Sequence, residues 1–571
     1  MREQTNSAES QGSAETKSKR DRHPKRLPFS VLIVALCLFA AIPLARWLVY
    51  DIDHQFANLA GMGLFLFGSG IFYLGVWIWV ANSWRKHLVF FFLPGTLCAI
   101  GCLFFEFVGF TGETMPVFRA RAWLKGTIKS PERTSPANSE IATNATRDSS
   151  AIPFESTQFL GSDRNGIVSN SEFAVQWETQ LPKVLWKIPI GAGWSSFAVS
   201  SGLAITLEQI DEQESITAFE LTTGKVVWRL KSPGRHTQAF GGLGPRSTPT
   251  IYQGKVFAQT AMGILSCVEL QTGKLVWQQD LLKLAGVDKE TSEKAILWGR
   301  SGSPLVVDNQ IVVPFGGRSG DRALRSLIAF ELESGKELWS SDEHQIAYSS
   351  PVLMTLCGVR QIVNVNEGVA VGYDPANGKV LWTTEWPSSS NGDACSSQAV
   401  QLDERRLLLG KGYALGSKAI ELSYSGTTPE NESDAAYWKV EQVWSSNKIL
   451  KTKFTSSILL DGSLFGLSDG VLECVDPKDG TRIWRGKKYG QGQLIVVNKH
   501  LLVTTEDGRI VLIPATREGL GKAIAEMPVL EGITWNVPAV AGPYLLVRNA
   551  EFAACLISSE EAGHDAKSAT E

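Results

Sequence analysis

A short phrase that recurs five times is the feature that most constrains how this chain can fold. The copies occupy residues 218–228, 267–277, 329–339, 372–382 and 474–484. In each copy a small residue, an acidic residue, a turn that ends in Gly and a Trp stand at fixed offsets. Self-similarity with a period of about 40–60 residues indicates an array of identical supersecondary units that pack on one another.

Each copy has the pattern of a β-hairpin. Apolar residues alternate up to the acidic position, and the Gly can take the positive φ that such a turn requires. A Trp buries ~150–250 Å², which is worth about 4–6 kcal/mol when a neighbouring unit covers the ring. We predict that the tryptophans that dock one unit on the next are Trp186, Trp228, Trp277, Trp339, Trp382 and Trp484.

A second phrase, in which Ser, Thr or Pro precedes an apolar strand, brings the number of predicted units to eight. Four short antiparallel strands per unit predict an all-β, eight-bladed propeller. The last unit lacks a strand that ends in Trp, whereas residues 184–188 form a spare strand before the first unit. We expect this strand to complete the last blade and close the ring. An open solenoid is the alternative.

Three apolar runs precede the repeats, at residues 29–50, 58–82 and 87–110. Each is long enough to cross about 30 Å of hydrocarbon. A secretory signal peptide fits less well, because three such runs follow one another. Basic residues in the leader and at Arg85 and Lys86 predict a cytoplasmic N-terminus, so that three transmembrane helices export the propeller. Basic residues after the third run favour the opposite orientation.

Two details of these runs bear on their role. Gly61, Gly68 and Gly75 fall seven residues apart and predict close packing of a neighbouring helix rather than a transport path. Glu106 is the only acid within the runs, and it lies near the end of the third one. There it is better explained as an interfacial carboxylate than as a proton relay.

The chain is therefore expected to contain five regions. The linker is rich in Ser, Thr, Pro, Asn and Ala, which is typical of flexible segments. The regions are a basic leader (1–26), a three-helix membrane anchor (27–112), a juxtamembrane segment and linker (113–157), the propeller (158–558) and a disordered tail (559–571).

Composition and motifs exclude several functions. The net charge is −3, and the soluble part has no basic stripe with interleaved aromatics, so we predict no nucleic-acid binding. Cys267, Cys474 and Cys555 occupy the small-residue position of the repeat and are expected to be buried as small hydrophobes. The seven histidines lack the paired spacing of a zinc site, so no metal site is predicted. Residues 466–470 match the nucleophile elbow of hydrolases but lack its strand-to-helix context, and we predict no catalytic residue.

The Gly-Lys-x-x-Trp repeats resemble the tryptophan-docking motifs of the pyrroloquinoline-quinone (PQQ) type propellers, over residues 158–558, and residues 159–166 resemble their lead-in segment. The resemblance implies one of two kinds of protein. Quinoprotein dehydrogenases hold PQQ and calcium in the funnel of the propeller and oxidise alcohols or sugars. Non-enzymatic members, similar to the lipoprotein of the outer-membrane β-barrel assembly machine, bind protein partners. This chain lacks the adjacent cysteine pair of many dehydrogenases, and it also lacks a lipobox.

A binding site is expected at one mouth of the axial channel, where the innermost strand of each blade begins. Arg246 and Arg300, from adjacent blades, could together bind a carboxylate. Trp194 and Trp535, from the first and last blades, could clamp a planar or apolar group. Alternatively, the aromatic residues cap blade ends and the arginines tie loops together. The predicted rim residues are Trp194, Arg246, Arg300, Tyr348, Asp393, Phe454, Tyr489 and Trp535.

These observations favour a propeller anchored in the inner (cytoplasmic) membrane, on its periplasmic side, that binds a protein, peptide or small ligand without chemistry and without a cofactor. The alternative is a PQQ-dependent dehydrogenase of alcohols or sugars, with PQQ and calcium as cofactors. A third possibility is a sensor or scaffold whose transmembrane helices assemble with other membrane proteins.

Overall fold

The structure is a computed structural model that describes residues 29–50, 53–80, 84–121, 154–169, 171–316, 325–341, 344–388, 390, 393–425 and 438–558. The basic leader, residues 122–153 of the predicted juxtamembrane segment and linker, and the C-terminal tail lie outside these residues. The chain forms two compact units. One contains the residues up to Trp47 together with Leu59–Leu103, and the other contains Leu48–Asn58 and everything from Phe104 onward.

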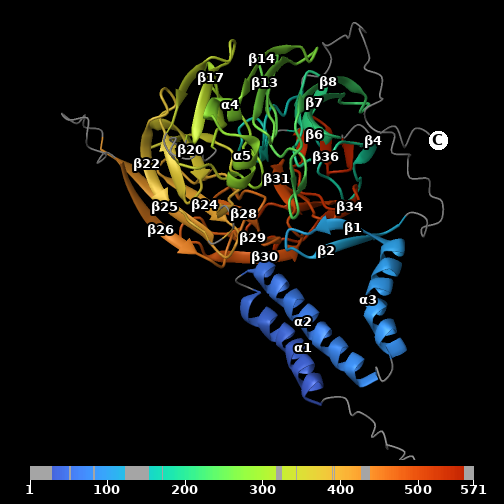
Figure 1. The fold of residues 1–571 in the computed structure, drawn as a ribbon. Helices are drawn as coiled ribbons and strands as arrows, with labels where there is room; N and C mark the ends of the chain where they lie inside the picture. Colours follow the sequence, from blue (N-terminus) through green and yellow to red (C-terminus); the bar gives the residue numbers. More distant parts are fainter. Residues whose placement is uncertain are drawn as a thin grey trace, which may run out of the picture. The chain divides into compact units, whose positions relative to one another are not determined.

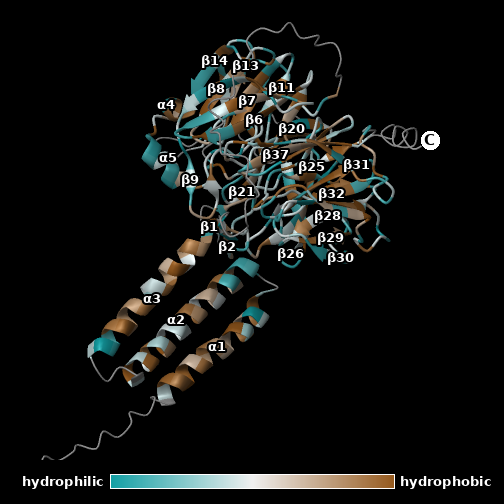
Figure 2. Cartoon of the chain, turned by 90° about the vertical axis from the view of Figure 1, so that its right-hand side faces the viewer, coloured by the Kyte–Doolittle hydropathy of each residue, from teal (hydrophilic) through white to brown (hydrophobic). Residues whose placement is uncertain are grey.

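Three long helices occupy the N-terminal part: α1 (Phe29–Val49), α2 (His54–Val80) and α3 (Trp84–Phe104). Within the described residues these are the helices that are long and apolar enough to cross a membrane. Apolar residues cover much of each helix (Figure 2). The predicted third span was wrong at its end, because α3 stops at Phe104 and residues 105–110 are a β-strand.

The glycine stripe of α2 faces α1, as its spacing predicts. A Cβ added at Gly75 or Gly68 would lie 2.6 or 3.1 Å from the nearest α1 side-chain atom, which is too close at Gly75 and tight at Gly68, whereas at Gly61 it would make an ordinary contact of 3.6 Å. The three glycine–side-chain contacts are Gly61 with Ile42, Gly68 with Phe39, and Gly75 with Val31.

The second unit contains an eight-bladed β-propeller, which confirms the predicted fold. The blades follow one another around the ring in chain order, from green through yellow to red (Figure 1). The first strands of neighbouring blades contact one another, so they are the innermost strands of the ring. Blade 1 contains β5 (Ala198–Ser200), β6 (Leu203–Ile210), β7 (Gln213–Glu220) and β8 (Val226–Pro233). Blade 2 contains β11 (Thr250–Tyr252), β12 (Lys255–Gln259), β13 (Ile264–Glu269) and β14 (Leu275–Asp280).

The next four blades repeat this antiparallel pattern. Blade 3 contains β15 (Leu305–Val307), β16 (Gln310–Pro314), β17 (Leu327–Glu331) and β18 (Glu337–Ser340). Blade 4 contains β19 (Val352–Leu356), β20 (Val359–Asn366), β21 (Val369–Tyr373) and β22 (Val380–Glu385). Blade 5 contains β23 (Val400–Gln401), β24 (Arg406–Lys411), β25 (Gly416–Tyr424) and β26 (Trp438–Ser446). Blade 6 contains β27 (Ile458–Leu460), β28 (Ser463–Ser468), β29 (Val471–Val475) and β30 (Arg482–Lys488).

The last two blades each take a strand from the N-terminal side of the ring. Blade 7 contains β31 (Gln493–Val497), β32 (His500–Thr504), β33 (Arg509–Pro514) and β34 (Ala525–Pro528), with β3 (Ile167–Val168) parallel to β31. Blade 8 contains β35 (Ala539–Ala541), β36 (Tyr544–Arg548), β37 (Phe552–Ile557) and β4 (Lys183–Pro189). Because β4 pairs with β37, the predicted closure of the ring by residues 184–188 is confirmed.

A buried arginine strengthens this closure. Arg548 of blade 8 donates hydrogen bonds to Thr206 Oγ1 (2.7 Å) and to the carbonyls of Leu207 (2.9 Å) and Gly191 (2.9 Å), which belong to blade 1 and its entry loop. Burial lowers the pKa of Arg548 to about 10, so the guanidinium stays charged at neutral pH.

Most docking tryptophans lie between a small residue of their own blade and a glycine of the next. The small residue is directly opposite the Trp in the sheet register, for example Ala218 opposite Trp228 and Cys267 opposite Trp277. On the other side, a Cβ at Gly273 would come within 2.5 Å of the Trp228 ring, and the indole N–H donates to Leu270 O (2.8 Å) in the next blade. The repeat therefore supplies both the Trp and the Gly of this contact between neighbouring blades.

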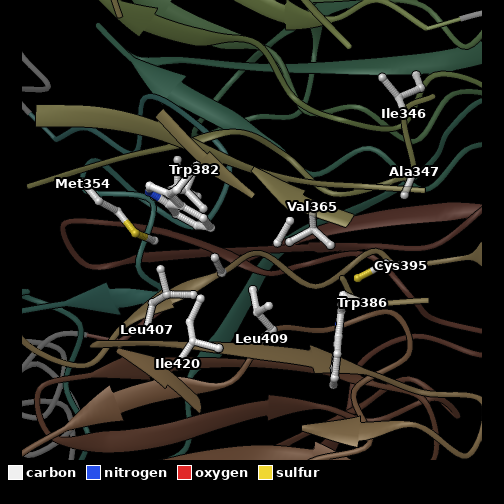
Figure 3. Packing of buried hydrophobic residues seen from close by; sticks show 14 of the residues in the cluster. Ile346, Ala347, Met354, Val365, Trp382, Trp386, Cys395, Leu407, Leu409 and Ile420 are labelled. Atoms are coloured by element: carbon white, nitrogen blue, oxygen red, sulfur yellow. The ribbon is translucent and has the colours of Figure 1, made fainter. Parts of the chain in front are cut away.

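This contact recurs around most of the ring. The Trp–Gly pairs are Trp186–Gly224, Trp228–Gly273, Trp277–Gly335, Trp339–Gly378, Trp444–Gly480 and Trp484–Gly521. Trp382 differs, because its N–H bonds Gln361 of its own blade (2.5 Å) and its ring lies in an apolar cluster with Met354 of blade 4 and Leu407 of blade 5 (Figure 3).

Two further pieces accompany the ring. A loop between blades 1 and 2 carries the short strands β9 (Thr237–Gln238) and β10 (Gly242–Leu243), and helices α4 (Leu281–Ala285) and α5 (Lys289–Ala295) lie between blades 2 and 3. Strands β1 (Phe105–Phe110) and β2 (Pro116–Ala120) form a hairpin in the same compact unit as the propeller. The domain boundary expected at residue 112 thus falls inside this hairpin.

Candidate functional site at the channel mouth

The eight predicted rim residues each stand shortly before the innermost strand of a blade. Arg246 precedes β11 and Trp535 precedes β35, for example. Five of the eight are buried and three are half-buried in the described structure. The buried residues are Arg300, Tyr348, Asp393, Tyr489 and Trp535, and the half-buried ones are Trp194, Arg246 and Phe454.

Three of the rim aromatics contact one another. The ring centroid of Trp535 lies 4.7 Å from that of Trp194 and 4.9 Å from that of Phe454. Both indole N–H groups are used: Trp194 donates to Gly241 O (2.7 Å) and Trp535 donates to Glu506 Oε1 (2.8 Å). The first and last blades thus bring their tryptophans together, but the rings pack against each other at a tilt of 43° within the protein.

The two rim arginines do not converge on one carboxylate. Arg246 donates to Gly244 O (3.0 Å) and Gly241 O (2.7 Å) in the loop that precedes it. Arg300 donates to Phe315 O (2.9 Å) and to Ser292 Oγ (3.0 Å) on α5. Burial lowers the pKa of each to about 10, so both remain charged at neutral pH. Their contacts are those expected of side chains that tie loops to the ring.

The remaining charged rim residue, Asp393, forms an internal ion pair. Asp393 Oδ1 lies 2.7 Å from Lys411 Nζ, and both side chains are buried. The same Nζ donates to Trp386 O (2.6 Å). Because a buried charge needs such partners, this pair is a structural element of blades 4 and 5.

The tip of the β1–β2 hairpin lies against the rim on the side of blades 6 to 8. The backbone N–H of Gly112 donates to Glu506 Oε1 (2.6 Å), the same oxygen that accepts from Trp535. Lys453 Nζ donates to Gly112 O (3.4 Å). A Cβ at Gly112 would lie 2.3 Å from Gln491 and 2.9 Å from Phe454, so the backbone approaches the rim more closely than any residue with a side chain would allow.

The residue after Gly112 anchors the hairpin electrostatically. Glu113 Oε1 lies 2.9 Å from His54 Nδ1 and 2.6 Å from Lys488 Nζ of blade 6. Burial by itself would raise the pKa of Glu113, but the hydrogen bonds and charges of His54 and Lys488 outweigh it and lower the pKa to about 2. The Lys488 Nζ also donates to Tyr50 OH (3.0 Å), and the Tyr50 ring stacks on His54 with centroids 3.9 Å apart.

The lead-in segment, residues 154–168, contacts the innermost part of several blades. Arg164 donates to Pro304 O (2.7 Å) and Ser303 O (3.1 Å) at the start of blade 3, and burial lowers its pKa to about 9. Its other partners in innermost strands are Val199 of blade 1, Ile251 of blade 2 and Val496 of blade 7. Blades 3 and 7 are on opposite sides of a ring of eight, so a segment that contacts both must cross the axis of the ring.

Sequence reasoning missed most of this arrangement. Glu506 lies in a closing turn of the second repeated phrase, but Gly112, Glu113 and Lys453 were not assigned to any repeated phrase, so their convergence had no signal in the spacing. Trp444 was also missed as a docking residue, although its opposite partner Ala419 fits the small-residue rule and its N–H bonds Pro477 O (3.0 Å). The longer β25–β26 connection replaces the Gly-Lys turn of that blade and hides the repeat.

The residues present do not fit the calcium site that a quinoprotein dehydrogenase would require. Within the described residues there is no group of three or more His, Cys, Asp or Glu side chains placed to hold a metal ion. The acidic groups at this mouth already have protein partners, namely Lys411 for Asp393, Lys451 for Asp469, and Gly112 and Trp535 for Glu506.

A closed ring of eight blades, docked through Trp–Gly contacts, defines a β-propeller of the PQQ-like repeat class. The family described as "Outer membrane protein assembly factor BamB" matches residues 133–295 and 212–486, which together cover more than half of the 571 residues. The chain therefore belongs to this family of PQQ-like propellers.

Individual relatives match smaller parts. The outer membrane protein assembly factor BamB of Moranella endobia is 24% identical over 221 residues, which are 38% of this chain and 51% of that protein. The BamB of Xanthomonas campestris pv. campestris is 32% identical over 99 residues, 17% of this chain and 21% of that protein. The matched part thus spans about half, or less, of these curated relatives.

Solved structures with a similar fold include proteins of both kinds. BamB from Moraxella catarrhalis aligns with a TM-score of 0.44 and 14% identity, over 66% of this chain and 100% of that one. A europium-containing methanol dehydrogenase aligns with a TM-score of 0.41 and 12% identity, over 69% of this chain and 90% of that one. At these scores neither structure is informative about function.

Proposed function

We propose that this protein is a membrane-anchored, extracytoplasmic β-propeller that binds a protein partner and catalyses no reaction. The observation that carries the proposal is the occupation of the axial channel by the chain itself. Residues 154–168 cross the ring, and the tip of the β1–β2 hairpin covers the rim at Gly112. A dehydrogenase of this class needs the same space for its cofactor and substrate.

The rim remains a binding site in this proposal, but its occupant is the chain's own hairpin. The charged groups of the rim are engaged by internal partners, as the Glu506–Gly112 and Asp393–Lys411 contacts illustrate. A protein partner would then bind the outer surface of the ring, where a rigid scaffold presents loops and strand edges.

The proposed location follows from the three apolar helices. With a basic leader and with Arg85 and Lys86 on the cytoplasmic side, an odd number of transmembrane helices exports the propeller from the cytoplasm. We place the protein in the inner (cytoplasmic) membrane on this basis. The names of the matched relatives suggest a partner that takes part in outer-membrane protein assembly.

Two measurements on the full-length protein test the proposal. In the first, purified protein is supplied with PQQ, Ca²⁺ and an artificial electron acceptor, and dye reduction is followed with a panel of alcohols and sugars. We expect no turnover above the control without PQQ. Sustained PQQ-dependent turnover would overturn the proposal in favour of a dehydrogenase.

In the second, p-benzoylphenylalanine replaces exposed residues of the ring in living cells, and the adducts formed on illumination are identified by mass spectrometry. Suitable positions are Leu338, Val443 and Leu520, whose side chains are exposed. We expect at least one position to yield a reproducible adduct with a single envelope protein. An absence of protein adducts at all positions around the ring would contradict partner binding.

A further inference from the structure

The β1–β2 hairpin is amphipathic in the manner of a strand pair, with one aromatic face and one polar face. Side chains directly opposite each other in an antiparallel pair point to the same face. Phe107 is opposite Phe118, with ring centroids 5.7 Å apart, and Glu106 is opposite Arg119. Aromatic and ionic pairs therefore alternate along the hairpin.

A β-bulge keeps this separation intact to the end of β1. The register shifts between Phe107 and Gly109, so Val108 is an extra residue in the strand. After one extra residue the alternation changes phase, which places Phe110 on the same face as Phe107 instead of the opposite one. The two rings are 5.1 Å apart, as this geometry requires.

The polar face is bound to the propeller. Both terminal nitrogens of Arg119 donate hydrogen bonds to the carboxylate of Glu551 in blade 8 (3.0 Å each), and Nε of Arg119 donates one to Glu106 (2.8 Å). Gly109 belongs to the same face, since a Cβ there would lie 3.5 Å from Ile533. A bidentate pair of this kind fixes orientation as well as position.

The aromatic face points away from these contacts and stays exposed. The exposed fractions are 51% for Phe105, 53% for Phe107 and 61% for Phe118. At its inner end Phe110 contacts Phe240 of the β9–β10 loop, with ring centroids 5.0 Å apart, and Phe240 is itself 45% exposed. A contiguous aromatic surface of this kind on a soluble unit calls for a partner.

We propose that this aromatic face binds the interfacial region of the lipid bilayer on the propeller side of the membrane. This inference rests on the proposed membrane anchor. Phe105 directly follows Phe104, the last residue of the third candidate span. Three extended residues reach at most about 10 Å, and the interfacial layer on each side of the hydrocarbon is roughly 5–8 Å thick, so Phe105 and Phe107 cannot leave the vicinity of the bilayer. Phe118 is paired with Phe107 and is confined with it.

Binding at this surface would give the hairpin two roles. Its polar face holds blade 8 through Arg119 and Glu551, and its aromatic face holds the interface, where amphipathic segments with aromatic residues partition favourably. The hairpin would thereby fix how the propeller is presented at the membrane surface.

Photo-crosslinking to lipid tests this inference on the full-length protein in vesicles of phosphatidylcholine and phosphatidylglycerol. p-Benzoylphenylalanine replaces Phe107 or Phe118 in separate preparations. Leu520, a propeller residue that is 58% exposed, is the matched control for exposure, and Leu66, 69% exposed on α2, reports on the anchor itself. We expect positions 107 and 118 to give at least about tenfold more lipid adduct than position 520, and position 66 to give lipid adduct as well.

The control at position 66 distinguishes a failure of the hairpin inference from a failure of the proposed membrane anchor. Lipid adduct at 66 but only background at 107 and 118 would overturn the interfacial hairpin and leave the anchor standing. Protein adducts at 107 and 118 in place of lipid would overturn it in favour of a protein-binding face. Background at all four positions would overturn the anchor and the hairpin inference together.

Discussion

The interfaces between neighbouring blades, here called seams, and the mouth of the channel are built in different ways. At the seams one contact recurs, a Trp between a small residue of its own blade and a Gly of the next. At the mouth each contact occurs once and joins segments that are far apart in the chain, as Gly112 and Glu506 do. A repeated contact can be recognised from spacing alone, whereas a single long-range contact cannot.

The two regions also differ in chemistry. The seams are apolar and depend on the volume of the indole ring. The mouth depends on charged groups held by partners of the same chain: the carboxylates of Glu113 and Asp393 are buried, and Lys488 pairs with Glu113. Substitutions at the seams should therefore affect the stability of the ring at any pH, whereas substitutions at the mouth should act locally and depend on pH.

The largest expected effect comes from the seam that the sequence pattern hides. Trp444→Ala should destabilise the propeller by about 3–5 kcal/mol, because it removes a buried indole and leaves a cavity against Gly480. Trp277→Ala at a regular seam is the matched control and should cost the same within error. The measurement is thermal or denaturant unfolding of the full-length protein; a cost below 1 kcal/mol for Trp444→Ala alone would show that blade 5 is not docked like the others.

A second substitution separates backbone strain from ring contact at a seam. Gly273→Ala places a Cβ 2.5 Å from the Trp228 ring at φ +68°, whereas Gly254→Ala has nearly the same φ, +72°, and nothing within 4 Å. Gly254→Ala should cost about 1 kcal/mol from strain alone. Gly273→Ala should cost about 2–3 kcal/mol more because the ring must move.

Equal losses of stability in the two alanine variants would contradict the claim that Gly273 leaves the space in which the indole ring of Trp228 packs. The comparison is direct because both residues are turn glycines of blade 2, and denaturant midpoints at one pH suffice to measure it.

At the mouth, Glu113→Gln should lower stability at neutral pH by about 1–2 kcal/mol, after allowance for solvent screening. The pKa of Glu113 is about 2 in the folded protein, below its ordinary value of 4.5. Its contribution is therefore fully present above pH 4.5 and is lost as the pH falls toward 2, so wild type and variant should converge in melting temperature over that range.

Glu441→Gln is the control for this pH dependence, since Glu441 forms an exposed ion pair with Lys439. It should change the melting temperature little at any pH. A gap between wild type and Glu113→Gln that stays constant from pH 7 to pH 3 would mean that the carboxylate does not hold the hairpin.

The smallest expected effect is that of Arg119→Gln. The Arg119–Glu551 pair is partly exposed, so its loss should cost about 0.5–1 kcal/mol of global stability. The local effect should be clearer: hydrogen exchange in β1 and β2 should accelerate while the strands of blade 8 keep their protection. Unchanged exchange in the hairpin would show that its polar face is not bound through this arginine.

The sequence predicted the blade number, the closing strand and five of the six tryptophans that pack on a glycine of the next blade, because each rests on a pattern repeated at fixed offsets; the glycines were predicted only as turn residues. The packing of Gly61, Gly68 and Gly75 against α1 was likewise predictable from a seven-residue spacing. The rim residues were placed correctly in the chain, before the innermost strands, but their partners were not foreseen.

Other features could not be predicted from the sequence, for physical reasons. The apolar character of β1 made it indistinguishable from the end of a transmembrane helix, since Phe105, Phe107 and Phe110 satisfy either pattern. Glu106 was interpreted as an interfacial carboxylate, but its pairing with Arg119 across the hairpin had no signal in the sequence. Arg246 and Arg300 suggested ligand binding, but the carbonyls that they bind come from irregular loops that no pattern specifies.

Hydrogen exchange at the hairpin tip tests most directly the central claim that the chain occupies its own channel mouth. The measurement compares residues 109–115 with the blade strands in full-length protein in lipid nanodiscs, for the wild type and for Glu506→Ala. We predict slow exchange of the Gly112 region in the wild type and a marked acceleration in Glu506→Ala, with the strands of blades 1 to 4 unchanged. Rapid exchange of this region in the wild type, as in an exposed turn, would contradict the claim and leave the mouth open to an external ligand.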